Sequence, residues 1–186
     1  AMLALVDFCL AAPEALQVRC LETLGERELQ GLCEVLIDCV QGGASVSFML
    51  PMTRDKAERF WASAAASVAR GERLVLGAYA AGQLVGTVTV ILQQPENQPH
   101  RADLAKMLVQ RSARNTGVGA ALLAAAEQAA RRAGKTLLVL DTVTGSAAER
   151  LYVRHGWQRC GEIPDYALWP DGRPCPTTIF YKSLLP

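Results

Sequence analysis

A glycine-containing turn at the head of a predicted helix is the clearest candidate binding site in this sequence. The chain passes from a strand-like segment into an alanine-rich helix, predicted over 117–133, through Arg114-Asn115-Thr116-Gly117-Val118-Gly119-Ala120. Glycine lets the backbone approach a ligand closely, and the first N–H groups of a helix have no partner inside it. Together with the helix dipole, and with charge from Arg111 and Arg114, they favour a phosphate or pyrophosphate. The alternative is a glycine turn that only packs a strand against a helix.

Two other phosphate-binding loops do not fit this turn. No Lys-Ser or Lys-Thr follows the glycines, which excludes a Walker A loop. The third glycine of the dinucleotide-binding pattern is missing, and the turn lies late in the chain, after a predicted antiparallel meander. The turn is therefore expected in a different type of α/β fold.

Hydrophobic periodicity predicts the elements that must position the turn. A short strand near 16–20 is followed by a helix with one apolar face from Leu29 to Val40, and by a second helix that begins after the N-cap Thr53. Ser146 and Glu149 have the spacing of a capping box. The other elements are strands at 73–80, 83–93 and 103–110, the helix 117–133, a strand at 136–140, a helix after Ser146, and strands near 157–163 and 176–184. The order β-α-α-β-β-β-α-β-α-β-β predicts an α/β fold with a mixed central sheet and helices on both faces.

Length and composition indicate one globular domain. The chain has 186 residues, of which 51% are hydrophobic and 20% charged, and its net charge of +1 favours neither nucleic acid nor membrane as a partner. The six cysteines form no C-x-x-C pair and no His pair has zinc spacing, so no metal site is expected. Residues 1–14 lack the basic start of a signal peptide. We expect a loosely ordered extension over 1–14, a domain over 15–186 and a cytoplasmic location.

Two motifs indicate a family. Met107-Leu108-Val109, followed by Arg114-x-x-Gly117-x-Gly119-Ala120, resembles motif A of the GNAT superfamily of N-acetyltransferases. Further along, Ala148-x-x-Leu151-Tyr152-x-x-x-Gly156-Trp157 is similar to the next motif of that superfamily. The order and spacing of the two motifs make the resemblance specific. It implies a single-domain GNAT fold, acetyl-CoA as co-substrate and transfer of an acetyl group to an amine.

A closer resemblance extends over residues 17–184. Gly42-Gly43-Ala44-Ser45-Val46, Leu140-Asp141-Thr142 and Pro170-Asp171-Gly172-Arg173 are similar to segments of the tabtoxin-resistance acetyltransferases, a group within the superfamily. These enzymes acetylate an amino-acid-like β-lactam toxin. The resemblance therefore implies a small amino-acid-like amine or antimetabolite as the acceptor.

The resemblance also assigns cofactor-binding residues. The backbone of 107–109 would pair with the pantetheine arm, and the N–H of Val109 would polarise the thioester carbonyl. The turn 114–120 would hold the pyrophosphate. Many members of the superfamily carry Asn at the position of Gly145, so Ser146 is expected to supply a substitute hydroxyl, although its capping role uses the same oxygen.

Three side chains are candidates for catalysis. The resemblance implies that Tyr152 is the general acid for the leaving thiolate. Asp141 and Asp103 match acidic positions of the tabtoxin-resistance acetyltransferases. Asp141 also ends an apolar strand, where open α/β sheets place their ligands. An alkylammonium with a pKa of about 10 must lose a proton before it attacks, so one of these carboxylates, or a water beside it, is expected to be the base. The alternatives are structural: acids at strand ends, and a packed tyrosine bonded to the backbone.

The acceptor side is expected in the loop 42–52, with Ser45 and Phe48 as lining residues, and in the tail around Tyr166 and Trp169. A net charge near zero favours a small-molecule amine over a protein amine. Other classes stay open: an acyl-CoA-binding sensor without catalysis, an acetyltransferase that acts on a protein amine, and a structural domain. The sequence also leaves the oligomeric state open, a homodimer included.

Overall fold

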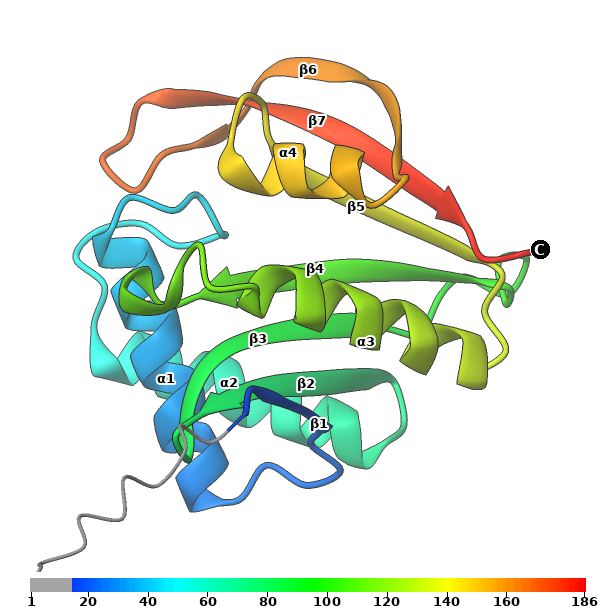
Figure 1. The fold of residues 1–186 in the computed structure, drawn as a ribbon. Helices are drawn as coiled ribbons and strands as arrows, with labels where there is room; N and C mark the ends of the chain where they lie inside the picture. Colours follow the sequence, from blue (N-terminus) through cyan, green and yellow to red (C-terminus); the bar gives the residue numbers. More distant parts are fainter. Residues whose placement is uncertain (1–14) are drawn as a thin grey trace, which may run out of the picture.

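The computed structural model describes residues 15–186, in which a seven-stranded mixed sheet has helices on both faces (Figure 1). The predicted extension over 1–14 lies outside the described residues. The elements occur in the predicted order, with one added 3₁₀ turn at Arg111–Ala113. They are β1 (Gln17–Cys20), α1 (Glu26–Gln41), α2 (Arg54–Ala69), β2 (Arg73–Ala80), β3 (Gln83–Ile91), β4 (Arg101–Val109), α3 (Val118–Arg132), β5 (Leu137–Val143), α4 (Ala147–Arg154), β6 (Gln158–Leu168) and β7 (Pro174–Ser183).

The separation of two parallel strands is the feature of the sheet that matters for function. The strand order is β1-β2-β3-β4-β5-β7-β6, and among these strands of residues 15–186 only β4 and β5 run parallel. Their pairing joins Arg101–Asp103 to Leu137–Val139 and goes no further. Figure 1 shows β4 and β5 diverging toward their C-terminal ends. The head of α3 and the start of α4 follow these two strand ends along the chain.

Both predicted helix caps are confirmed. Thr53 Oγ1 accepts a hydrogen bond from the Lys56 N–H (3.2 Å), and Ser146 Oγ accepts one from the Glu149 N–H (3.1 Å). Each bond satisfies an N–H that the first helical turn leaves without a partner. The start of α2 and the start of α4 are therefore determined locally.

Some strand boundaries differ from the predicted ones. β5 continues past the apolar run to Val143, and β6 continues past Pro164 to Leu168. In both cases β7 supplies backbone partners, with an irregular register between Ile163 and Ala167. Backbone pairing does not require apolar side chains, and an edge strand tolerates proline. Periodicity alone therefore ended both strands too early.

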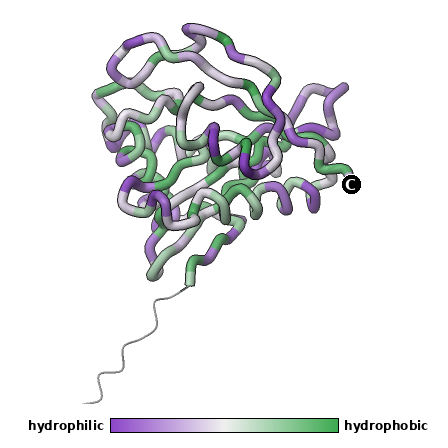
Figure 2. The backbone as a smooth tube through the Cα atoms, turned by 45° about the horizontal axis from the view of Figure 1, so that its top comes forward, coloured by the Kyte–Doolittle hydropathy of each residue, from purple (hydrophilic) through white to green (hydrophobic). Residues whose placement is uncertain are grey.

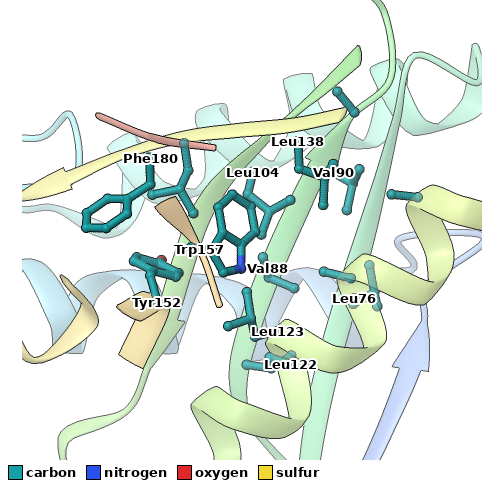
Figure 3. Packing of buried hydrophobic residues seen from close by; sticks show 14 of the residues in the cluster. Leu76, Val88, Val90, Leu104, Leu122, Leu123, Leu138, Tyr152, Trp157 and Phe180 are labelled. Carbon is teal, nitrogen blue, oxygen red and sulfur yellow. The ribbon is translucent and has the colours of Figure 1, made fainter. Parts of the chain in front are cut away.

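Two hydrophobic clusters fill the space between the sheet and the helices. One lies under α3 and includes Tyr152, Trp157 and Phe180 (Figure 3). The other lies under α1 and α2 and is built around Trp61. Figure 2 shows green, hydrophobic stretches mainly in the interior of the molecule and purple, hydrophilic stretches mainly in its outer segments. No helix within 15–186 combines the length and the apolar composition needed to cross a membrane.

Candidate active site

The head of α3 leaves room for an anionic group. Gly117 is the N-cap, its φ of +88° lies in the left-handed region, and no side chain of residues 15–186 caps this end of the helix. A Cβ built on Gly117 would have no atom within 4 Å. The first N–H groups of α3 therefore have no side-chain partner within 15–186, which leaves them available to an anion.

The N–H of Val109 points toward the gap between β4 and β5. Val109 is opposite Gly86 of β3, while the next N–H, that of Gln110, donates to the Val85 carbonyl at 2.9 Å. This pattern makes Val109 and Gly86 a non-hydrogen-bonded pair, in which the N–H and C=O groups turn away from the partner strand. The opposite side of β4 is the one from which β5 has separated. The backbone at Val109 is therefore oriented as the predicted oxyanion contact requires.

The two arginines near the turn have different partners. Arg111 is bound to Asp38 of α1: its N–H and Nε donate to the two carboxylate oxygens at 2.8 and 3.0 Å. Arg114 is exposed and donates from Nε to the Val109 carbonyl at 3.3 Å. That carbonyl also accepts from the Cys39 Sγ at 3.4 Å. Arg114 is therefore the arginine still available to an anion at the turn, and Arg111 holds the turn against α1.

A cavity of about 240 Å³ lies where β4 and β5 separate. Its lining combines apolar strand residues with two carboxylates and a tyrosine from the β6–β7 region. The lining residues are Ile91, Asp103, Leu104, Ala105, Val139, Leu140, Asp141, Tyr166 and Ile179. The structure thus brings together both predicted base candidates and Tyr166, one of the tail residues expected on the acceptor side.

The two carboxylates differ in how they are engaged. Asp103 is held by an ion pair from Arg101 Nη1 and by a hydrogen bond from Gln94 Nε2 at 3.1 Å. Asp141 is exposed, and its carboxylate forms no hydrogen bond or ion pair with any residue in 15–186. A carboxylate whose oxygens already accept hydrogen bonds has fewer lone pairs free to meet a substrate proton. Asp141 is therefore the better placed of the two to accept one.

The ring of Tyr152 is packed in the core, and its hydroxyl has no hydrogen-bond partner within residues 15–186. The side chain is only 4% exposed, and its ring centroid lies 5.8 Å from that of Trp157 and 6.0 Å from that of Phe180 (Figure 3). Within the described residues its hydroxyl makes no hydrogen bond. Burial raises the pKa of Tyr152, and the negative charge of Asp141 raises it further. The hydroxyl is thus protonated at neutral pH, as a proton donor must be.

A buried polar network that sequence reasoning missed supports this tyrosine. Trp157 Nε1 donates to Glu127 Oε1 at 3.0 Å, and Lys182 Nζ lies 2.8 Å from Glu127 Oε2. Lys182 also donates to the carbonyl of His155, the C-cap of α4, at 2.7 Å. The network therefore fixes the end of α4 that carries Tyr152. Its members come from α3, β7 and the turn after α4, so no local spacing announces it.

Ser45 and Phe48, which were predicted to line the acceptor side, do not line this cavity. Ser45 Oγ donates to the Leu168 carbonyl at 2.7 Å, and Phe48 packs edge-on against Phe60 at 5.4 Å. The N–H of Leu50 also bonds the β6–β7 turn. The loop between α1 and α2 is thereby tied to the β6–β7 hairpin. Ser146 uses its oxygen as the cap of α4, so its predicted contact with the cofactor stays a prediction.

Comparisons with known proteins concern the family and the fold of this chain. The model of the acetyltransferase (GNAT) family matches residues 37–157. An uncharacterized N-acetyltransferase from the hisH-hisA intergenic region of Azospirillum brasilense is 29% identical over 123 residues, which are 65% of this chain and 71% of that protein. The ribosomal-protein-alanine N-acetyltransferase of Brucella melitensis has a similar structure, with a TM-score of 0.74, 24% identity and coverage of 90% and 99% of the two chains. The structure of yncA from Salmonella typhimurium, determined with its cofactor acetyl-CoA, is also similar. Its TM-score is 0.75, the identity is 19%, and the match covers 92% of this chain and 95% of that chain.

Proposed function

This chain belongs to the acetyltransferase (GNAT) family, and we propose that it acetylates the primary amine of a small amino-acid-like molecule. It is an N-acetyltransferase that uses acetyl-CoA. The observation that carries the proposal is the placement of Asp141, an unpaired carboxylate that lines the cavity between the separated strands. An amine bound there would have a proton acceptor beside it.

The residues at the cofactor side fit acetyl-CoA. The open first turn of α3 at Gly117 and the exposed Arg114 would hold the pyrophosphate, and the backbone of 107–109 would hold the pantetheine arm. When bound, acetyl-CoA supplies an activated acetyl group as a thioester. The Val109 N–H, which points toward the gap, would stabilise negative charge on the carbonyl oxygen.

Asp141 and Tyr152 divide the proton transfers between them. Asp141 accepts the proton of the ammonium, directly or through a water, because only a neutral amine is nucleophilic. Tyr152 holds a proton on its hydroxyl oxygen for the leaving sulfur. Asp103 stays paired with Arg101 and keeps the start of β4 in place. The mechanism therefore needs one base and one acid.

A small acceptor fits the closed wall of the site better than an extended peptide does. Hydrogen bonds from Ser45 and from the Leu50 N–H join the loop after α1 to the β6–β7 hairpin. Because the loop and the hairpin are joined, they leave less room for an extended peptide to lie across the site. We include amino-acid antimetabolites of the tabtoxin type in the proposed class, and a cytoplasmic location belongs to the same proposal.

Acetyl-CoA should stabilise the fold and release thiol when the correct amine is present. A ligand at about 100 times its dissociation constant adds roughly 2.7 kcal/mol to the free energy of unfolding, so saturating acetyl-CoA should raise the Tm by several degrees. ATP and NAD serve as matched nucleotide controls and should leave the Tm where it is. Thiol release is then measured against amino acids, antimetabolites, polyamines and aminoglycosides. A Tm shift without thiol release from any amine, peptide amines included, would indicate a sensor.

Tyr152→Phe should slow the chemical step, because it removes a hydroxyl and keeps the ring packed against Trp157 and Phe180. A thiol with a pKa of about 8.5 already leaves well, so we expect the low end of general-acid effects, on the order of 10²-fold or less in kcat. The KM for the amine should change little. Steady-state kinetics at pH 7–8, with a thermal melt of the variant, test this. Wild-type kcat in the variant would rule out the acid role.

A further inference from the structure

Lys106 interrupts β4 on the acceptor side of the sheet. The pairing of β3 with β4 shifts register between Thr87 and Thr89, and Lys106 stands at this bulge with a φ of +51°. The left-handed region is sterically unfavourable for a lysine and would be easily adopted by a glycine. Bulges re-aim side chains, often next to active sites. The bulge therefore turns this side chain away from the regular alternation of the strand.

The side chain of Lys106 is directed to the loop and the helix that flank the acceptor side. Its Nζ donates to Ser47 Oγ at 3.0 Å and lies 5.5 Å from the centroid of the Phe60 ring. Ser47 belongs to the same loop that is tied to the β6–β7 hairpin, and Ala105, the neighbour of Lys106, lines the cavity. The ammonium is therefore placed at the edge of the proposed acceptor site.

This ammonium has no anionic partner in the described part of the chain. Within 15–186 no carboxylate lies within ion-pair distance of Lys106 Nζ, and one of its three N–H donors is used by Ser47. Burial lowers the pKa of Lys106, and the charge of Asp141 partly opposes that effect. A hydroxyl and an aromatic face offset only part of the desolvation cost of a half-buried cation. A ligand carboxylate would supply the missing charge.

We propose that Lys106 binds the carboxylate of the acceptor, so that the site selects amines that also carry a carboxylate. The inference rests on the proposed function. An amino acid would then be held at both charged ends, with its ammonium near Asp141 and its carboxylate near Lys106. An amine without a carboxylate would leave the lysine unpaired and would bind more weakly.

The test compares amino acids with their amides, which differ only at the carboxylate. Thiol release is measured with acetyl-CoA and each acid–amide pair, for the wild type and for Lys106→Met, which keeps the length of the side chain and its contact with Phe60. A hydrogen bond to a charged group corresponds to about 10- to 100-fold in affinity. We expect the acid-to-amide ratio of kcat/KM to fall by about that factor, mainly through the KM of the acid. Lys106→Arg should retain most of the ratio.

Lys56→Met is the matched control for a loosened loop. Lys56 Nζ bonds the carbonyls of Met49 and Pro51, so its loss should affect acid and amide alike. An acid-to-amide ratio that is the same in Lys106→Met and in the wild type overturns the inference and leaves the proposed function standing. Absence of thiol release from every amine in the wild type overturns the proposed function as well. If Lys106→Met melts at a much lower temperature than the wild type, Lys106→Gln takes its place. The expected fall in the acid-to-amide ratio of kcat/KM is the same for this variant.

Discussion

Asp141→Asn should lower kcat/KM for the amine by about 10²–10⁴-fold at pH 7 and leave acetyl-CoA binding intact. The substitution keeps the size of the side chain and removes only the proton acceptor, and no residue in 15–186 loses a hydrogen bond or ion pair by it. The loss should become smaller as the pH approaches 10, because a growing fraction of the amine is neutral without a base. Rate profiles between pH 6 and 10, with acetyl-CoA titrations, measure both effects.

Asp103→Asn is the matched control for this prediction. It makes the same chemical change on the neighbouring strand, but it weakens the ion pair with Arg101. We expect a moderate loss of stability and a much smaller loss of rate. If Asp103→Asn shows the large loss of rate and Asp141→Asn the small one, Asp103 is the base. If Asp141→Asn keeps full activity at every pH, the proton passes to Asp103 or to water.

Gly119→Asp should weaken acetyl-CoA binding by on the order of 10²–10³-fold, because two like charges a few ångströms apart repel by up to ~4 kcal/mol at a protein surface. Gly119 is in the first turn of α3, where an acidic side chain favours the helix itself. The fold should therefore survive while the affinity falls. Calorimetric titration with acetyl-CoA and a circular dichroism melt measure the two separately.

Gly119→Ala separates the charge from the packing. A Cβ at this position would lie 3.2 Å from Leu151 Cδ2 of α4, so either variant must displace that side chain by a few tenths of an ångström. The alanine variant should lose little affinity if charge is the cause. Equal losses in the two variants would mean that contact with α4 controls the turn. Full affinity in a folded Gly119→Asp would place the phosphates away from this helix.

The element order and the site elements could be predicted because their causes are local. An apolar face at helical spacing, an N-cap such as Thr53 or Ser146, and glycines before an alanine-rich run act within a few positions of the chain. Such effects determine where α2, α3 and α4 begin. The position of Asp141 directly after the apolar run of β5 follows from the same kind of pattern, although the strand itself continues to Val143.

The roles of particular side chains required the tertiary structure. Ser45 was predicted to line the acceptor pocket, but its hydroxyl is bonded to Leu168, far along the chain. The sequence left both Asp141 and Asp103 open as the base, and their different partners in space distinguish them. Lys106 gave no signal, because a lysine in a strand is typical of a solvated face.

The sequence by itself determined the order of the elements, the caps and the glycine turn at the head of α3. The tertiary structure decided that β4 and β5 separate after Asp103, that the Val109 N–H points toward the gap, and that Lys106 reaches Ser47. The physical reason is the range of the interactions. Propensity, periodicity and capping depend on neighbours along the chain, whereas strand separation, register shifts and ion pairs depend on partners that meet only after the chain has folded.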